Sequence, residues 1–312
     1  MELSPIGLSV YSRLPHIKKT VTSLSRNKLA SESILFIFSD GPQRGDEEKV
    51  RAVRRYLRTI SGFKEIHIIE RDRNSRVENN RNGIRRLLDE YGKIIYLEED
   101  IVTAPKFIDF MNKALDFYRN DPRIISVTGY SPPIILPSGY VKDIYLSLRF
   151  SAWGFGIWKD RYDKIKMKIE GYDNFHKDPK ALKRFRMGGE DLMELLRLEF
   201  EGKIDALDVK IMFQQFQQNL YTLAPARSLV QNTGHDGTGV HCTKTDKYSS
   251  VLDMSERTLR MEENIEPDQD LLNRLYEFRS GGIKAKLERV LKRTALLPLV
   301  KFARTKIARL IS

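Results

Sequence analysis

The stretch Ile94-Ile95-Tyr96-Leu97-Glu98-Glu99-Asp100-Ile101 decides how this chain is interpreted. Its apolar first half is typical of a buried β-strand, and the strand ends abruptly in three consecutive carboxylates. In an open α/β sheet, the carboxyl ends of the strands form the edge at which ligands bind. Adjacent acids repel one another, so a cation is their natural partner, and oxygen ligands suit Mg²⁺ or Mn²⁺ bound to a phosphate. An ordinary acidic turn after a strand remains the alternative.

Apolar runs on both sides of this stretch alternate with amphipathic helical patterns. The runs predict strands over 5–11, 33–38, 64–69, 94–97, 123–128 and 220–225. Helices are predicted around 17–24 and over 47–60, 78–91, 105–119, 163–200 and 211–216. Strands that alternate with helices of about 12 residues predict an α/β fold with a mostly parallel central sheet flanked by helices.

The sequence lacks the two common glycine-rich nucleotide motifs. No G-x-G-x-x-G follows the first strand, and no G-x-x-x-x-G-K-[ST] occurs in the chain. A nucleotide bound by this sheet would therefore be held by side chains and a metal ion.

Composition indicates a globular protein, with 41% hydrophobic and 31% charged residues among 312. The single cysteine, Cys242, excludes an internal disulfide framework and suits a reducing compartment. No stretch is apolar enough to span a bilayer, and the N-terminus lacks the pattern of a signal peptide. We therefore expect a cytoplasmic protein.

Positive charge is concentrated near the C-terminus. Residues 281–312 hold nine Lys or Arg and one Glu, which is +8 of the formal net charge of +12. The remaining residues carry little net charge and no recognisable nucleic-acid motif, so nucleic-acid binding is not expected. The segment 283–312 is basic and amphipathic, which predicts contact with an anionic membrane surface, with packing on the body or self-association as the alternative. In the first case the protein would be peripheral on the inner face of the plasma membrane.

Two further segments have compositions that suggest ligand contacts. Phe150-Ser-Ala-Trp-Gly-Phe-Gly-Ile-Trp158 brings together two glycines and two indoles, and indoles offer flat apolar faces on which sugar rings pack. Aromatic core packing is the alternative for this segment. The loop Asn232-Thr-Gly-His-Asp-Gly-Thr-Gly-Val-His241 contains three glycines, two histidines and an acid in ten residues.

Six segments, taken in chain order, carry a resemblance to one family. They are Val10-Tyr11-Ser12-Arg13, Ser39-Asp40-Gly41-Pro42, Leu97-Glu98-Glu99-Asp100 followed by Pro105-x-Phe107, Trp153-Gly154-Phe155-Gly156, Gly202-Lys203-Ile204-Asp205 and the 232–241 loop. The set spans residues 4–245 and resembles the GT-A-fold nucleotide-sugar glycosyltransferases of bacterial surface-polysaccharide synthesis, which are distantly similar to N-acetylglucosaminyltransferase I. The resemblance implies an inverting, metal-dependent transfer from a nucleoside-diphosphate sugar, with a UDP-sugar as the expected donor, to a glycan or lipid-linked acceptor.

The resemblance also implies roles for individual residues. Asp100, in the place of the last acid of a D-x-D-type motif, would hold Mn²⁺ or Mg²⁺ against the donor diphosphate, and His241 would be a second metal or diphosphate contact, ahead of His235. The implied donor and nucleotide contacts are Val10, Tyr11, Arg13, Asp40, Glu98 and Glu99. The implied acceptor or sugar contacts are Trp153, Gly154, Phe155 and Gly156.

An inverting transfer needs a base for the acceptor hydroxyl, and two acids compete for this role. Asp205 is the first choice, although Ala206-Leu207 stands where relatives carry Ser/Thr-Trp. Asp191, in Gly189-Glu190-Asp191-Leu192, resembles the x-E-D motif of many GT-A enzymes. A nucleotidyltransferase that acts on a sugar phosphate, or a non-catalytic glycan- or nucleotide-binding module, is the alternative function.

The same resemblance predicts how the chain is divided. A transferase domain would cover 1–245, with a nucleotide-binding half over 1–128 and an acceptor and catalytic half over 129–245. A basic, helical C-terminal extension would follow over 246–312.

Overall fold

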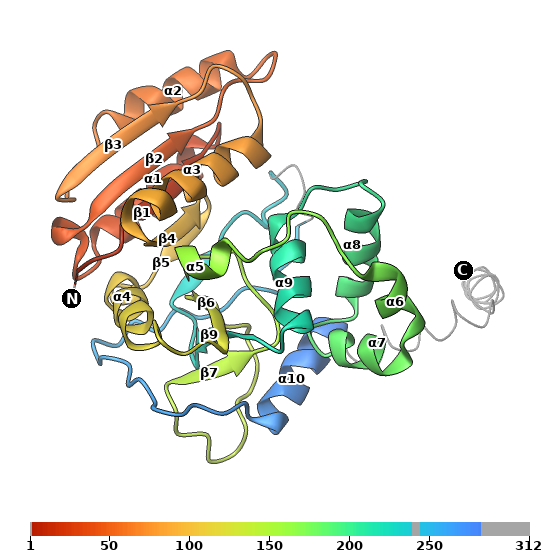
Figure 1. Ribbon diagram of the computed structural model, residues 1–312. Helices are drawn as coiled ribbons and strands as arrows, with labels where there is room; N and C mark the ends of the chain where they lie inside the picture. The colour runs from red at the N-terminus through yellow and green to blue at the C-terminus, as the bar shows by residue number, and fades with distance from the viewer. Residues whose placement is uncertain (1, 239–243, 282–312) are drawn as a thin grey trace, which may run out of the picture.

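The computed structural model describes residues 2–238 and 244–281 of the chain. An eight-stranded sheet forms its centre, in the order β3-β2-β1-β4-β8-β6-β9-β7 (Figure 1). The strands are β1 (Ile6–Val10), β2 (Ile34–Ser39), β3 (Glu65–Glu70), β4 (Lys93–Glu98), β6 (Ile124–Thr128), β7 (Ile144–Ser147), β8 (Phe155–Trp158) and β9 (Tyr221–Pro225). Only β7 and β8 run opposite to the other six. The predicted α/β fold with a mostly parallel central sheet is confirmed.

Helices cover both faces of the sheet, because the strands alternate their apolar side chains between two cores. In β4, Ile95 and Leu97 join one core, and Ile94 and Tyr96 join the other. The first core includes residues of α1 (Leu14–Ser25), α2 (Glu47–Leu57) and α4 (Phe107–Phe117). The second includes residues of α3 (Arg76–Tyr91), α5 (Lys159–Tyr162), α6 (Tyr172–Lys177), α7 (Pro179–Arg186), α8 (Asp191–Phe200) and α9 (Leu207–Gln217). Glu98 continues the alternation of Ile94 and Tyr96 toward the second core.

Local signals explain where α3 begins and ends. The Ser75 side chain accepts a hydrogen bond from the Glu78 amide, which is the pattern of an N-terminal cap. Gly92 ends the helix in the left-handed conformation, with φ of 72°, where glycine carries no steric penalty. The start of α3 lies at the carboxyl edge of the sheet, beside Asp40, and the turn at Gly92 leads directly into β4 at the opposite edge.

The single helical region expected over 163–200 is wrong, since the chain forms three short helices there. Asp178 caps α7 by accepting from the amides of Lys180 and Ala181, and Pro179 occupies the first turn, where its missing amide costs nothing. Gly188-Gly189 then separates α7 from α8, and Gly189 has a φ of 138°.

A small second sheet brings the 233–238 loop to the carboxyl edge of the main sheet. It consists of β5 (Ile101–Thr103) and β10 (Val230–Asn232), which pair antiparallel. Just beyond this pairing, the Asp100 carbonyl accepts hydrogen bonds from the amide (2.8 Å) and hydroxyl (3.0 Å) of Thr233. The loop that follows Thr233 therefore starts beside the acidic stretch.

The described part of the expected C-terminal extension, 246–281, packs against the body. Buried Lys106 forms an ion pair with Asp253 at 2.8 Å, and Leu259 and Ile265 enter the first core. Helix α10 (Gln269–Ser280) packs on β7 and β9 through a third apolar cluster, which contains Tyr145, Ala224, Leu271, Leu272 and Leu275. Segment 283–312 lies outside the described residues.

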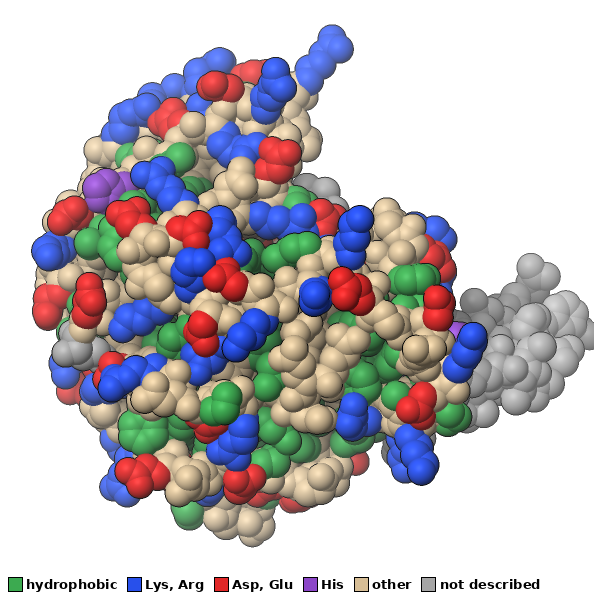
Figure 2. All heavy atoms as spheres, viewed as in Figure 1, with side chains coloured by type: hydrophobic (Ala, Val, Ile, Leu, Met, Phe, Trp, Pro, Cys, Tyr) green, Lys and Arg blue, Asp and Glu red, His purple; other side chains and the backbone are tan. Residues whose placement is uncertain are grey.

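Figure 2 shows Lys and Arg side chains gathered over the edge where α2 lies, interspersed with acids, and a notch in the outline between this lobe and the part that carries α8.

Within residues 2–238 and 244–281, no helix has the length and apolar character that crossing a membrane requires.

Candidate active site

The carboxyl ends of β1, β2 and β4 meet at one edge of the sheet, because these strands are parallel neighbours. Tyr11 and Arg13 follow β1, Asp40 follows β2, and Glu98 to Asp100 follow or end β4. Segments far apart in sequence thus place most of the predicted donor site in one region. Val10, the last residue of β1, is buried and serves as core.

Glu99 is engaged within the chain by both of its carboxylate oxygens. One oxygen accepts from the Tyr11 amide at 2.5 Å, and the other accepts from Arg13 Nε at 2.7 Å. The Glu99 side chain is 9% exposed, so these contacts replace most of its water. Glu99 therefore fixes the chain after β1 and orients the Arg13 guanidinium.

Asp100 has one carboxylate oxygen in an ion pair and one without a hydrogen-bond partner in the described part of the chain. Oδ2 pairs with Arg13 Nη2 at 2.7 Å, whereas Oδ1 is buried without a hydrogen-bond partner among the residues that the structure describes. A buried carboxylate oxygen left unpaired is costly, and such an oxygen points to a ligand or ion. Gly234 lies directly against Asp100, and a Cβ at this position would overlap Oδ2.

Glu98, which ends β4, is the second carboxylate considered as a metal ligand, after Asp100. Its Oε1 accepts from Asn80 Nδ2 at 3.2 Å, and Asn80 lies on α3. Burial, and after it the negative charge of Asp100, raises the pKa of Glu98 to about 7. Carboxylate oxygens such as those of Glu98 and Asp100 suit Mg²⁺ or Mn²⁺, with phosphate oxygens as the other ligands. Over the described ranges, no cluster of three or more His, Cys, Asp or Glu could supply an all-protein site.

Asp40 is buried and its carboxylate is satisfied by backbone and side-chain donors. It accepts from the amides of Gly41 (2.9 Å) and Ser75 (3.1 Å) and from Asn74 Nδ2 (3.2 Å). These contacts tie the turn after β2 to the N-terminus of α3. Tyr11 has a comparable role, since its hydroxyl donates to Asp46 at 2.9 Å and accepts from the Gln43 amide at 2.9 Å.

The four residues predicted to contact sugar have different surroundings. Phe155 is 4% exposed and packs between Tyr96 and Phe150, and a Cβ on Gly156 would meet Leu115 and the Ile94 carbonyl. Both residues of β8 are therefore parts of the core. Gly154, with φ of 61°, is close-packed against Val230 and Phe107.

Trp153 is only partly buried and gathers other aromatic rings around it. Its ring centroid lies 4.5 Å from that of Tyr130, 5.4 Å from His235 and 5.9 Å from Tyr248. Neither ring nitrogen of His235 has a hydrogen-bond partner in the described part of the chain. This cluster adjoins the Asp100 carboxylate through Gly234. His241 lies outside the described residues.

The two candidate bases are both held by cations. Asp191 accepts from the two terminal nitrogens of Arg149, each at 2.8 Å, and Asp205 pairs with Arg81 and with buried Lys210. Burial opposes ionisation of both acids, but the hydrogen bonds from Arg149, and those from Lys210 and Arg81, lower the pKa of Asp191 and Asp205. Each side chain is about half exposed, at 47% and 49%.

Several residues of this region carry no signal in the sequence. Tyr130 and Arg149 stand isolated in irregular segments, and Tyr248 and Arg279 fall in the stretch expected to be a separate extension. Asp208, in the first turn of α9, acts electrostatically on both Glu98 and Arg149. Only the folded chain brings these residues together, because no local spacing connects them.

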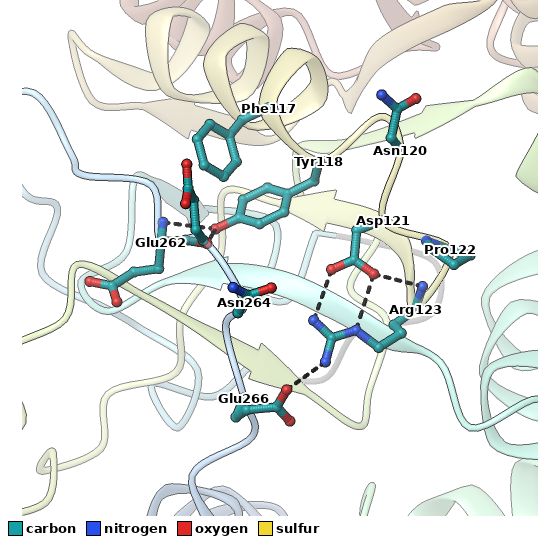
Figure 3. A pocket seen from close by; sticks show the side chains of 10 residues that line it. Phe117, Tyr118, Asn120, Asp121, Pro122, Arg123, Glu262, Asn264 and Glu266 are labelled. Atoms are coloured by element: carbon teal, nitrogen blue, oxygen red, sulfur yellow. Dashed lines mark hydrogen bonds and ion pairs between the residues drawn. The ribbon is translucent and has the colours of Figure 1, made fainter.

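Two cavities lie away from this edge. The larger, of about 630 Å³, lies between the end of α4, the start of β6 and segment 262–266 (Figure 3). There Arg123 pairs with Asp121 at 3.0 Å and with Glu266 at 2.8 Å. The smaller, of about 450 Å³, lies near the N-terminus, beside Pro5 and Ile34. Neither is lined by a residue of the predicted site.

No family model matches this chain, and no curated protein matches it. Its likenesses are to solved structures, beginning with S. aureus TarS, at 8% identity and a TM-score of 0.42, over 75% of this chain and 37% of that one. A mannosyltransferase, PcManGT from Pyrobaculum calidifontis in complex with GDP-Man and Mn²⁺, matches at 11% identity and 0.34, over 50% and 44%. Mouse xyloside xylosyltransferase 1 matches at 10% and 0.35, over 70% and 83%. The chain thus spans little more than a third of TarS, and TM-scores below 0.5 carry no argument about function.

Proposed function

We propose that this chain is an inverting, metal-dependent glycosyltransferase of the GT-A type. It would move a sugar from a nucleoside-diphosphate sugar, expected to be a UDP-sugar, to a glycan or lipid-linked acceptor in cell-surface polysaccharide synthesis. The observation that supports the proposal most is the buried Oδ1 of Asp100, at the carboxyl edge of a mostly parallel sheet, which has no hydrogen-bond partner within residues 2–238 and 244–281. Such an edge is where α/β sheets of this kind bind nucleotides.

Asp100 and Glu98 are the residues that would hold Mn²⁺ or Mg²⁺. Arg13 keeps Asp100 oriented by its ion pair to Oδ2, which leaves Oδ1 for the ion. The bound ion would neutralise charge on the departing nucleoside diphosphate. His235, whose two ring nitrogens lack partners within the described ranges, is a further candidate contact for the diphosphate.

Trp153 is the sugar contact that we retain, because its ring is partly exposed within the aromatic cluster.

Of the two candidate bases, Asp191 and Asp205, we infer that Asp191 accepts the proton of the acceptor hydroxyl. Its partner Arg149 shares the Gly188 carbonyl with Arg279 of α10. The same helix reaches the aromatic cluster around Trp153, since Phe278 contacts Tyr248. Asp205 is instead held by two cations, Arg81 and Lys210.

The decisive experiment is a thermal-shift titration with UDP, with and without Mn²⁺. At a UDP concentration of 100 times Kd, binding to the native state adds about 2.7 kcal/mol to the free energy of unfolding, which raises Tm by several degrees. We expect this rise for the native chain only with Mn²⁺, and expect Asp100→Asn to lose it. Asp270→Asn, an exposed acid on α10, is the matched control and should retain it.

Turnover separates the proposed function from its alternatives. Hydrolysis of a UDP-sugar that needs Asp191, and not Asp205, would support the assignment of the base. Release of pyrophosphate from a nucleoside triphosphate and a sugar phosphate would establish a nucleotidyltransferase instead. Mn²⁺-dependent binding of UDP with no transfer or hydrolysis of any UDP-sugar would establish a binding module.

Segment 283–312 is proposed to bind an anionic membrane surface and so place the protein on the inner face of the plasma membrane. The proposal rests on the excess of basic residues in this part of the sequence. Sedimentation with vesicles that contain anionic lipid should fall when 283–312 is deleted. Equal sedimentation of the full and shortened chains would refute it.

A further inference from the structure

Two arginines converge at the edge of the candidate site. Arg149 Nη1 and Arg279 Nη1 both donate to the carbonyl oxygen of Gly188, at 3.3 Å and 3.4 Å. Both residues also contact Ser147, whose hydroxyl accepts from the Arg149 amide at 3.1 Å and from Arg279 Nη2 at 3.3 Å. Two guanidinium groups thus lie side by side although they come from positions 130 residues apart.

Only one of these two arginines has a carboxylate partner in the described part of the chain. Asp191 is engaged by Arg149, and no carboxylate within residues 2–238 and 244–281 forms an ion pair with Arg279. Burial, and after it the positive charge of Arg149, lowers the pKa of Arg279 to about 10. The remaining neighbours, Tyr130 and Tyr145, are neutral at physiological pH. Arg279 is therefore a cation that no carboxylate of the described residues pairs with directly.

This arginine pair belongs to the same region as the metal-binding pair. Tyr130 lies within the electrostatic reach of Arg279 and packs edge-on against Trp153. Trp153 in turn contacts His235, and the preceding residue, Gly234, lies against Asp100. The negative charge of Asp208 acts on both Arg149 and Glu98. The arginines thus lie across the aromatic cluster from the proposed cation.

We propose that Arg149 and Arg279 together bind a phosphate group. Guanidinium forks match phosphate oxygens in pairs, and a phosphate group with a charge of about −2 would balance the two guanidinium groups when it replaces Asp191 on Arg149. The proposal deepens the proposed function and rests on it for the source of the phosphate, which is either the donor diphosphate or a phosphate carried by the acceptor. A phosphate that draws Arg149 away from Asp191 would also free that carboxylate to accept a proton.

The test uses the full chain and inorganic phosphate as the probe, titrated against chloride at equal ionic strength. At ten times Kd, phosphate should raise Tm of the native chain by about 3 °C. Arg279→Gln should weaken phosphate binding by about 10- to 100-fold, since charged hydrogen bonds are lost. Arg274→Gln, on the same helix but paired with Asp270, is the control and should bind phosphate as the native chain does.

Arg279→Lys is the second variant, because it keeps the positive charge and should bind phosphate more weakly than the native chain but better than Arg279→Gln. The proposal is overturned if phosphate gives the native chain no more stability than chloride does, or if Arg279→Gln binds phosphate unchanged.

A second titration, with UDP and Mn²⁺, identifies the source. Weaker UDP binding by Arg279→Gln assigns the pair to the donor diphosphate. Unchanged UDP binding, with phosphate still stabilising the UDP-bound native chain, assigns it to the acceptor. If phosphate binds through Arg279 while UDP does not bind at all, the arginine site stands and the proposed function fails.

Discussion

Replacing Glu98 by Gln should stabilise the protein at alkaline pH. The pKa of Glu98 rises from an ordinary value of 4.5 to about 7 in the folded chain, because of burial and the charge of Asp100. A carboxyl whose pKa is raised by folding contributes full stability below about pH 4.5 and loses it as the pH rises through 7. At about 1.4 kcal/mol per pKa unit, the wild-type chain forfeits up to about 3 kcal/mol by pH 8.5. Gln keeps the shape and the contact with Asn80 but cannot ionise.

The measurement is thermal or urea unfolding at pH 5 and pH 8.5 in the presence of EDTA. Glu98→Gln should unfold near the wild-type midpoint at pH 5 and about 5 °C above it at pH 8.5. Added Mn²⁺ should stabilise the wild type and leave the variant unaffected, because the amide is a poor substitute for a carboxylate ligand. Exposed Glu256→Gln is the control and should show no pH-dependent gap. A Glu98→Gln chain that is no more stable than wild type at pH 8.5 would refute the reasoning.

Two other substitutions test the packing around the site. Gly234→Ala would push a Cβ into Asp100 Oδ2, so we expect a loss of about 1–3 kcal/mol in urea unfolding and weaker Mn²⁺-dependent binding of UDP; unchanged stability would mean that the loop yields freely. Asp143 is buried opposite Arg257, whose hydrogen bonds outweigh burial and lower the pKa of Asp143. The stability from this pair is present above about pH 4 and lost as the pH falls through the lowered pKa, so Asp143→Asn should lose about 1 kcal/mol at pH 6 and less at pH 3, as a Tm series would measure.

The long apolar strands could be predicted from sequence because parallel strands covered on both faces are almost continuously apolar. The strands β1, β2 and β4 are of this kind, and each lies within two residues of its predicted bounds. The edge strand β3 also lies within two residues of its predicted bounds, although its residues are only partly buried or exposed. The short strand β8 could not be predicted, since its position depends on distant partners. It inserts antiparallel between β4 and β6, and Gly156 is required there by the closeness of Leu115 and the Ile94 carbonyl. The division of 172–200 into three helices could have been predicted from two local signals, the Asp178-Pro179 start of α7 and the Gly188-Gly189 pair that precedes α8.

The sequence predicted that the three carboxylates lie at the carboxyl edge of the sheet, and the structure has them there. The sequence could not show which of the three is available to a ligand. Three adjacent carboxylates look alike in sequence, but β4 ends at Glu98 and the next two residues form a turn, so tertiary contacts decide where each carboxylate lies. Glu99 turns toward Arg13 and the backbone of Tyr11, while Glu98 and Asp100 repel each other. The distinction between a carboxylate that fixes a loop and one left for a ligand therefore appears only with the tertiary contacts.

Those contacts also bear on where the domain ends, and a truncation pair would test this. Removing 246–312 would leave buried Lys106 without its ion-pair partner Asp253. It would also remove Leu259, Ile265 and Leu271 from the apolar clusters and expose the side chains that they cover. Breaking a buried ion pair costs about 3–5 kcal/mol and exposing each of the three side chains about 1.5–3 kcal/mol, which together approach the whole stability of a typical domain. A 1–281 chain should therefore unfold cooperatively near the Tm of the full chain, and a 1–245 chain should not fold. Cooperative unfolding of 1–245 within a few degrees of the full chain would show that 246–281 is an appendage after all; its failure to fold would make Tyr248 and Arg279 parts of one unit with the acidic edge.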